Sequence, residues 1–361
     1  MLDFSTKELL QMFDHTPKPQ TFLNDTFFGT QQTFVTDKVE VQYRDGNRKM
    51  APFVSPLLPG KVGENTGYQV AEYKPPTLKP ARVITAEDLK KASFGENVYS
   101  TKSPEERQAE LLAKNWIDME NEIQRTLEYM SASILFKGYI DVVGDGVFDR
   151  IDFNFTNKVA LAGTDTWDNY STDENGKYES NPIEDLEKWR LQVLRTGGGV
   201  PNICVMSHDV ASIFMQHPAV KETLDNRRND HLSVKPEYVQ DALMYLGTLS
   251  SGLEIYTYNE WIAEKTVDEF GEVTIKEESL VPEGQLMLGS TQMQGKTAFG
   301  AVTMFEQGGQ AMTYEAPWVP RMIGNTETGM TMKQELISNP LVVPDNLNGW
   351  LTARVIGGDN A

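Results

Sequence analysis

The sequence predicts an α+β fold with more than one lobe, and three observations lead to this prediction. The chain has 361 residues, more than the roughly 250–300 at which a single hydrophobic core stops growing. One long amphipathic helix is predicted over residues 104–137, and it runs directly into a strand-rich segment. Beyond residue 181 short helices and strands alternate, and after residue 285 the pattern is that of strands.

The N-terminal part of the chain predicts an extended arm followed by a long loop. Residues 1–38 form the arm, with a short helix near Thr6–Phe13, because Pro17 and Pro19 interrupt any longer helix. Residues 39–86 form the loop, and a loop of this length in a compact domain is usually functional or disordered. Its apolar side chains would be costly to leave in water, so we expect something outside the local chain to cover them. They are Phe53, Val54, Leu57, Leu58, Val62, Tyr68, Val70 and Tyr73.

The helix over residues 104–137 is the strongest element in the sequence. Ser103 is a good N-cap, Pro104 suits the first helical position, and Glu106 completes a capping box. An apolar residue follows at every third or fourth position, which predicts one buried stripe. The stripe consists of Leu112, Trp116, Met119, Ile123, Leu127, Met130 and Ile134.

The segment DVVGDGVFDRID at 141–152 allows two interpretations. Asp141, Asp145, Gly146 and Asp152 match four positions of an EF-hand calcium loop, but Val143 offers no oxygen at the third position. A turn between two runs with a period of two residues instead predicts a β-hairpin over residues 139–155 without a metal. We prefer the hairpin.

The second half of the chain predicts another lobe. A charged stretch rich in asparagine and glycine at 163–181 marks a boundary and is expected to lie on the surface. Residues 181–284 alternate between helices and strands and include an acidic hairpin at 265–276. Residues 285–361 return as strands, and 329–338 alternates like a strand with one exposed face.

No catalytic motif stands out in this chain. The histidines at positions 15, 208, 217 and 231 have no metal-binding spacing. His208 and Asp209 follow a strand, where catalytic pairs occur, but capping of the next helix by Ser207 or Asp209 is the preferred explanation. Cys204 lies in an apolar run and is expected to be a buried thiol. We therefore predict no catalytic residue, no metal and no cofactor.

Composition limits the partners that we expect. The net charge of −19 argues against a main surface that holds nucleic acid, since such binding needs Lys and Arg. No apolar run approaches the roughly 20 residues of a membrane helix, and the N-terminus does not resemble a secretory signal. A single cysteine excludes an internal disulfide and suits a reducing cytoplasm.

Five segments, in order along the chain, together resemble the lambda-type bacteriophage major capsid proteins. FVSPLLPG is similar to a loop segment of that family, EYKPPTLKP to its proline-rich return, and ILFKGYIDV to the junction of its long helix and hairpin. AVKETLDNRR and LMLGSTQMQG resemble two further segments, with Ser290 in place of an asparagine. These segments span residues 53–60, 72–80, 134–142, 219–228 and 286–295.

The resemblance implies the Hong Kong 97-type capsid fold. Its expected parts are an N-terminal arm (1–38), an extended loop (39–86), a peripheral domain (87–180) with a spine helix (104–137) and the hairpin (139–155), an axial domain (181–284), and return strands (285–361). In this fold the extended loop lies over a neighbouring subunit, which would cover its apolar residues. The resemblance therefore makes those residues candidate inter-subunit contacts, together with the charged Lys221, Glu222, Arg227 and Arg228.

The function that the resemblance implies is that of a major capsid protein. Such a protein assembles as pentamers and hexamers into the icosahedral head that encloses the double-stranded DNA of a tailed phage. Assembly in the host bacterial cytoplasm, a place in the virion, and DNA enclosure without sequence-specific binding are implied as well. The implied partners are further copies of the chain, a separate scaffolding protein, a portal protein and a trimeric decoration protein, with no membrane. Lys61 is available for a cross-link, but nothing nearby supports an isopeptide reaction.

Two other classes of protein stay open at this point. A cellular nanocompartment shell, as in encapsulins, shares the fold but encloses enzymes. An α/β enzyme is favoured only by the alternation at 181–260.

Overall fold

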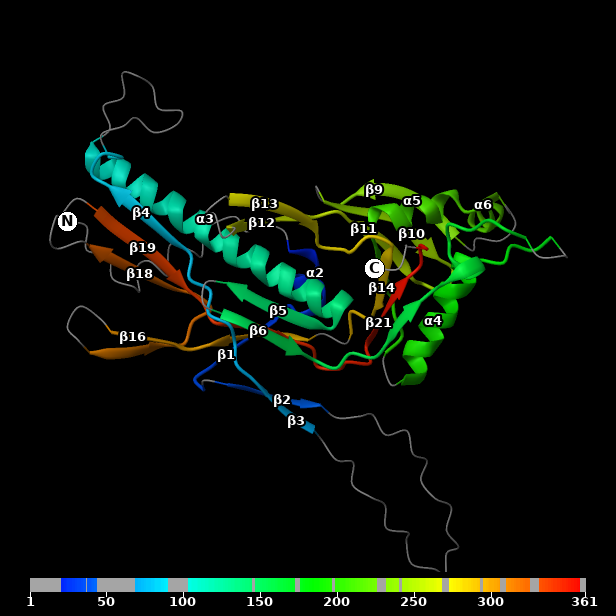
Figure 1. The fold of residues 1–361 in the computed structure, drawn as a ribbon, viewed down its shortest axis with the longest axis horizontal. Helices are drawn as coiled ribbons and strands as arrows, with labels where there is room; N and C mark the ends of the chain where they lie inside the picture. The colour runs from blue at the N-terminus through cyan, green and yellow to red at the C-terminus, as the bar shows by residue number, and fades with distance from the viewer. Residues whose placement is uncertain are drawn as a thin grey trace, which may run out of the picture. The chain divides into compact units, whose positions relative to one another are not determined.

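The computed structural model describes residues 21–36, 38–43, 69–89, 103–144, 147–172, 176–196, 199–225, 232–239, 242–267, 273–292, 295–305, 310–324 and 331–357. The chain divides into two compact units. Unit 1 consists of Met1–Val39, Lys74–Ser131 and Lys296–Val343, and unit 2 of Glu40–Tyr73, Ala132–Gly295 and Pro344–Ala361. Figure 1 shows the elements of both units.

In its described residues, unit 1 combines two helices with two small sheets and a hairpin. The helices are α2 (Phe22–Phe27) and α3 (Pro104–Ala132). One sheet has the order β1 (Thr30–Phe34), β15 (Lys296–Gly300), β20 (Pro340–Val343), and the other β18 (Val319–Gly324), β19 (Thr331–Ile337), β4 (Ala81–Thr85). Strands β16 (Val302–Phe305) and β17 (Ala311–Tyr314) form the hairpin.

Helix α3 begins where the sequence predicts. The amide of Ser103 donates to Glu106 Oε2 at 2.8 Å, and the amide of Glu106 donates to Ser103 Oγ at 3.2 Å, so the capping box is reciprocal. The predicted stripe is confirmed, because each of its seven side chains is buried. A buried stripe of this length fixes which side of the helix faces the core.

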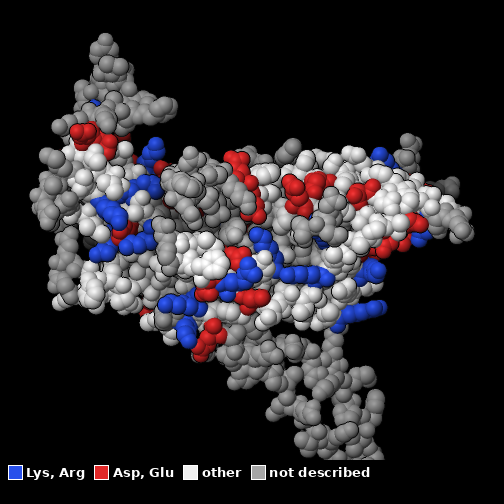
Figure 2. Space-filling model, viewed as in Figure 1, with Lys and Arg blue, Asp and Glu red and all other residues white. Residues whose placement is uncertain are grey.

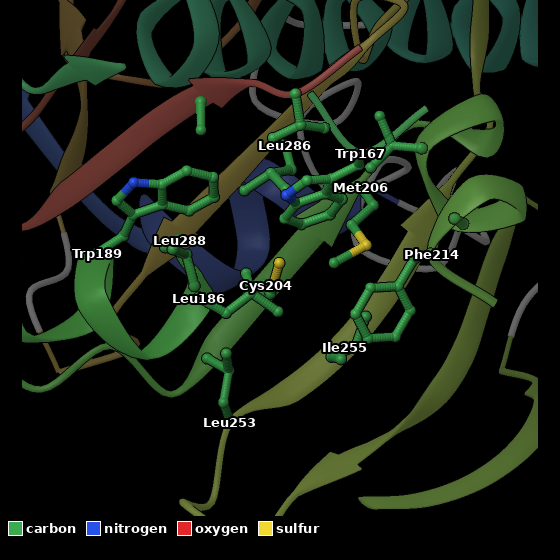
Figure 3. Close-up of a cluster of buried hydrophobic side chains, with 14 of the residues drawn as sticks. Trp167, Leu186, Trp189, Cys204, Met206, Phe214, Leu253, Ile255, Leu286 and Leu288 are labelled. Carbon is green, nitrogen blue, oxygen red and sulfur yellow. The ribbon is translucent and has the colours of Figure 1, made fainter. Parts of the chain in front are cut away.

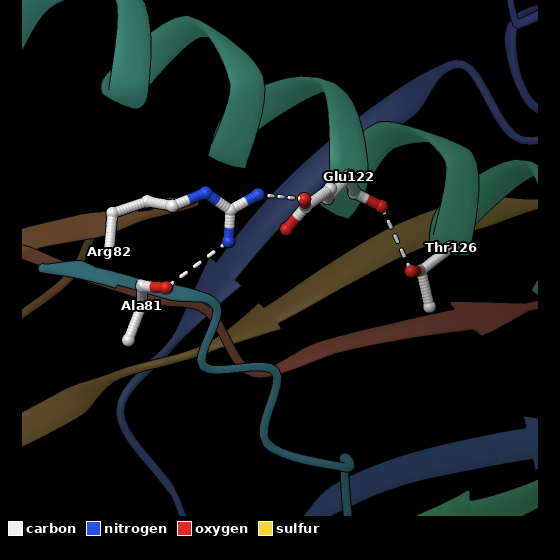
Figure 4. A network of polar contacts seen from close by, with 4 residues as sticks. All are labelled: Ala81, Arg82, Glu122 and Thr126. Carbon is white, nitrogen blue, oxygen red and sulfur yellow. Dashed lines mark hydrogen bonds and ion pairs between the residues drawn. The ribbon is translucent and has the colours of Figure 1, made fainter. Parts of the chain in front are cut away.

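Polar contacts join α3 to the β18–β19–β4 sheet, over which it lies (Figure 1). Gln334 on β19 accepts from Asn115 Nδ2 at 2.8 Å and donates to the carbonyl of Leu112. Arg82 on β4 binds the carboxylate of Glu122 and also donates to the carbonyl of Ala81, as Figure 4 shows. These contacts set the position of the helix along the strands.

A buried carboxylate on α3 caps the short helix α2. Glu128 is 2 % exposed, and its two oxygens accept from the amides of Leu23 at 2.8 Å and Asn24 at 2.9 Å. These amides are among the donors that a helix N-terminus leaves without an intrahelical acceptor. The Asn24 side chain also donates to Ser131 and Thr297. The beginning of the described chain is therefore held by a polar network inside unit 1.

Unit 2 is built on a mixed sheet of seven strands. Its order is β7 (Lys158–Ala160), β21 (Trp350–Arg354), β14 (Gln285–Gly289), β8 (Ile203–Met206), β11 (Glu254–Tyr258), β10 (Leu243–Leu249), β9 (Leu232–Tyr238). The β21–β7 and β11–β8 pairs are parallel, and the other pairs are antiparallel. The accompanying helices are α4 (Pro182–Thr196), α5 (His208–Gln216), α6 (Pro218–Asp225) and the short 3-10 helix η2 (Gly163–Asp165). The paired strands outside this sheet are β2 (Val39–Tyr43) with β3 (Gln69–Tyr73), β5 (Tyr139–Gly144) with β6 (Val147–Asp152), and β12 (Trp261–Val267) with β13 (Val273–Ser279).

The core of unit 2 lies between this sheet and its helices (Figure 3). Trp167 is completely buried there, stacks on Trp189 with ring centroids 6.0 Å apart, and donates from Nε1 to Asp185. Cys204 on β8 is also completely buried, and burial raises the pKa of its thiol. The buried-thiol prediction is confirmed, and a protonated thiol is a poor nucleophile.

Helix α3 is followed by a single π-helical turn. A π-helical turn, η1 (Ser133–Lys137), follows α3 and ends at Gly138, whose φ is 78°. A Cβ on Gly138 would come within 2.6 Å of the Phe155 Cβ, so the position requires glycine. Near the end of this turn, the carbonyl of Leu135 accepts hydrogen bonds from Trp350 Nε1 at 3.1 Å and Thr352 Oγ1 at 2.7 Å.

Several expectations need correction. The stretch at 163–181 is not only surface, because it contributes Trp167 to the core. The stretch at 329–338 contains β19, a central strand on which Gln334 and Glu335 are buried. Neither Ser207 nor Asp209 caps α5 through its side chain, since Ser207 makes no such bond and Asp209 accepts from the amide of Gly284. The short helix expected near Thr6–Phe13 lies outside the described residues.

A buried histidine joins the 169–180 segment to the helices of unit 2. His217 is completely buried between α5 and α6, and its Nδ1 accepts from the amide of Ala219 at 3.2 Å. Its Nε2 lies 2.9 Å from Ser180 Oγ, which donates to the carbonyl of Asn169 at 2.6 Å. The rings of Tyr170 and Tyr178 stand edge-on to the imidazole. Because Nδ1 accepts, this arrangement requires the neutral imidazole, and burial lowers the pKa of His217.

We predict that Glu128→Gln lowers the free energy of unfolding by about 1–3 kcal/mol, because the two amides of α2 bind different carboxylate oxygens and the NH2 group of glutamine that replaces one of them cannot accept. The measurement is urea unfolding of the full chain. The control is Glu122→Gln, which loses only the partly exposed ion pair with Arg82 and should change stability by less than about 1 kcal/mol. Equal effects of the two substitutions would contradict the capping role of Glu128.

We predict that stability falls on acidification and that His217 contributes to the fall. The unfolded chain binds a proton at this residue below about pH 6.5, whereas the folded chain resists it. The contribution is therefore fully present above that pH and is lost as pH falls toward the lower folded pKa. The free energy of unfolding, measured with urea from about pH 8 to about pH 5, should fall less steeply with pH for His217→Gln than for the wild type. The exposed His208 is the control, and a His208→Gln variant that flattened the profile instead would refute the assignment.

Candidate inter-subunit contact surfaces

The structure places only part of the predicted contact set. Phe53, Val54, Leu57, Leu58, Val62, Tyr68, Arg227 and Arg228 lie outside the described residues. Val70 and Tyr73 lie on β3, while Lys221 and Glu222 lie on α6. The four described positions thus belong to two separate elements.

Tyr73 stands at the end of β3 and contacts its own chain. Its hydroxyl donates to the carbonyl of Asp152 at 3.3 Å, and its ring centroid lies 5.1 Å from that of Phe153. The side chain is half-buried as a result. Since β3 pairs with β2, the two ends of the segment 44–68 start from one two-stranded base. Tyr73 fixes that base to the β5–β6 hairpin.

Lys221 and Glu222 are both exposed on α6. This helix begins at Pro218, directly after the buried His217. The start of α6 is thus held in the core, and its exposed charges stay candidates for a contact with another molecule. Charges at the edge of such a contact mainly affect the orientation of the partners and the rate of their association.

The segment 141–152 forms the predicted hairpin. Strands β5 and β6 pair from Tyr139↔Asp152 to Gly144↔Val147, with the connecting residues outside the described part of the chain. Asp141 is paired with Arg150 at 2.6 Å, and Arg150 also lies 4.2 Å from the Tyr139 ring centroid. The hairpin interpretation is confirmed. Asp141 serves as an ion-pair partner on a strand.

The end of this hairpin exposes apolar side chains that the sequence analysis did not single out. Val143 is opposite Phe148 on one face, and Val147 lies on the other. Their exposed fractions are 61 %, 90 % and 51 % in that order. Nearer the base, Ile140 and Ile151 are buried. Val143 and Phe148 lie on the face opposite Ile140 and Ile151, as alternation expects, whereas Val147 shares the face of Ile151 and is still exposed. The end of the hairpin is therefore a candidate contact surface.

The described residues supply little for other chemistry. Within that part of the chain no group of three or more His, Cys, Asp or Glu side chains is placed to hold a metal ion. No helix in the described ranges has the length and apolar character needed to cross a membrane.

Comparison with known proteins shows which family this chain resembles. The model of the family described as phage major capsid protein E matches residues 5–355. The major capsid protein of Escherichia phage lambda is 25 % identical over 83 % of this chain and 84 % of its own length. That of Enterobacteria phage phi80 is 26 % identical over 98 % of this chain and 99 % of its own length. These matches do not favour the nanocompartment alternative, and membership of a structural capsid family implies that the chain is not an enzyme.

A solved structure supports the fold independently of sequence. A candidate capsid protein of a prophage in Escherichia coli CFT073 superposes with a TM-score of 0.68 at 17 % identity, over 98 % of this chain and 99 % of that one. At this identity the likeness concerns the fold alone. Because the family model covers nearly the whole chain, this protein belongs to the phage major capsid protein E family and has the Hong Kong 97-type capsid fold.

Proposed function

We propose that copies of this chain form pentamers and hexamers, which close into the icosahedral head around the double-stranded DNA of a tailed phage. The observation that carries the proposal is the family match over residues 5–355. The match includes the loop and both units, and this extent supports the proposal that the whole chain is a shell subunit. In this proposal unit 2 supplies most of the axial domain, and α3 with its sheet supplies most of the peripheral domain.

The extended loop is the proposed clasp between subunits. The apolar residues from Phe53 to Val62 lie between β2 and β3, whose pairing holds the two ends of the segment together. Tyr73 anchors the base on the same subunit. An anchored base with an apolar segment beyond it fits a loop that reaches a neighbouring subunit and buries its side chains there. Each large apolar side chain buried in this way contributes about 1.5–3 kcal/mol.

The proposed partners follow from the requirements of such a head. A separate scaffolding protein guides closure, a portal protein occupies one vertex, and a trimeric decoration protein binds the outer surface. Assembly takes place in the host bacterial cytoplasm. The net charge of −19 supports enclosure of DNA without sequence-specific binding, because an acidic wall does not retain the genome.

We predict that replacing residues 53–62 with a Gly/Ser linker of equal length leaves the subunit folded and abolishes shells. The linker removes five apolar side chains but keeps the spacing between β2 and β3. The measurement is sedimentation and electron microscopy after co-expression with the scaffolding protein, with circular dichroism as the test of folding. Leu191→Ser, at a side chain 51 % exposed on α4, is the control and should form normal particles. Normal particles from the linker variant would show that the loop is not the clasp.

A further inference from the structure

The β18–β19–β4 sheet has a second face, opposite α3. Gln334 contacts α3, and because side chains alternate along a strand, its neighbours Lys333 and Glu335 lie on the other face. The register extends this face across the sheet. Lys333 is opposite Val83 on β4 and Ile323 on β18, and Glu335 is opposite Arg321.

Three cations surround one carboxylate on this face. Glu335 is 2 % exposed on its side chain, and its oxygens lie 2.7 Å from Lys333 Nζ, 3.1 Å from Lys79 Nζ and 3.9 Å from Arg321. Burial by itself raises the pKa of Glu335, but hydrogen bonds from Lys333 and Lys79 outweigh it and hold the pKa below its ordinary value. The carboxylate is therefore charged at neutral pH, and the cluster has a net charge of +2.

Only one end of this face is covered within the described chain. Val302 on β16 packs with Val319 and Ile337 at that end. At the other end Val83 is 57 % exposed and Ile323 is 37 % exposed, on either side of Lys333. The cationic side chains are also partly open to solvent, at 46 % for Lys79, 48 % for Lys333 and 35 % for Arg321. Figure 2 shows Lys and Arg side chains gathered over the region of β4, β18 and β19.

We propose that this open cationic face, defined by Lys79, Val83, Arg321, Ile323 and Lys333, is a contact that receives an acidic surface of a second copy of this chain. The proposal rests on the proposed function, in which identical subunits meet in a closed shell. With 52 acidic and 33 basic residues, most surfaces of two copies repel each other. A fixed group of net charge +2 is a site where the approach of an acidic neighbour is attractive.

Glutamate at the exposed apolar positions tests the proposal while leaving the buried cluster intact. In Val83→Glu and Ile323→Glu the new carboxylate stands opposite Lys333, and opposite charges across strands are favourable within the subunit. The fold should therefore tolerate either substitution. The charge of the face falls by one, and the yield of particles co-expressed with the scaffolding protein should fall by about tenfold or more.

Val83→Lys and Ile323→Lys are the matched controls. They remove the same apolar side chains but add to the positive charge, so particle yield should stay near that of the wild type. The difference in particle yield between the Glu and Lys variants should become smaller at about 0.5 M salt, because screening weakens interactions between exposed charges. Binding of each purified variant to the scaffolding protein is measured in parallel and should be unchanged.

Each other result overturns the inference in a distinguishable way. If all four variants assemble like the wild type, the face is not a contact. Because a lysine opposite Lys333 is unfavourable within the subunit, folding of the Lys variants is checked by circular dichroism. If they are folded and fail as well, the contact is apolar and charge does not define it. Loss of scaffold binding in the Glu variants would make the scaffolding protein the occupant. Should the wild-type chain itself form no particles, the proposed function fails and this inference fails with it.

Discussion

Helix α3 carries the constraint on which unit 1 depends, because several of its sides make contacts that require one position. Its apolar stripe is buried, Asn115 and Glu122 bind the β18–β19–β4 sheet, and Glu128 caps α2. In unit 2 the π-helical turn η1, which follows α3 in the chain, supplies the Leu135 carbonyl to Trp350 and Thr352 on β21. A shift of one residue rotates an α-helix by about 100° and would misplace the stripe, Asn115, Glu122 and Glu128 together within unit 1. The capping box at Ser103 fixes the residue at which the helix begins.

Buried polar groups give this arrangement its specificity. Glu128 and Glu335 are both 2 % exposed. Glu128 accepts hydrogen bonds from α2, and Glu335 forms an ion pair with Lys79, in each case with a segment far away in the sequence. A buried carboxylate that loses its donors is strongly destabilising, whereas apolar packing tolerates small displacements. Helix α2 and the segment before β4 are therefore each held in one position. The second case also fixes where the three cations of the proposed contact stand.

The parts of the fold that sequence predicted are those specified by neighbouring residues. The cap at Ser103, the stripe of α3 and the 139–155 hairpin depend on local spacing, and all three are present. Helix α2 was missed because its capping carboxylate comes from a residue about a hundred positions away. Strand β19 looked half-exposed because the partners that bury Gln334 and Glu335 lie on α3 and in the segment before β4. Among the candidate contacts, Phe148 was missed although alternation places it outside, because it stands three residues from the buried Ile151 and so on the opposite face of β6.

The two kinds of exposed surface suit different tasks in a shell. A cationic face on a chain of net charge −19 directs approach over distances of about 10 Å and discriminates between orientations, but salt weakens it. Apolar side chains such as Phe148 contribute only on contact. Their burial stabilises a contact by roughly 25 cal/mol per Å² of apolar surface, and this stabilisation does not depend on the direction of approach. If apolar contacts acted alone, subunits would also adhere in wrong orientations. Charge repulsion over most of the surface disfavours those encounters, so the buried Glu335, by holding its cations in place, would help select the orientation in which apolar surfaces come to be buried.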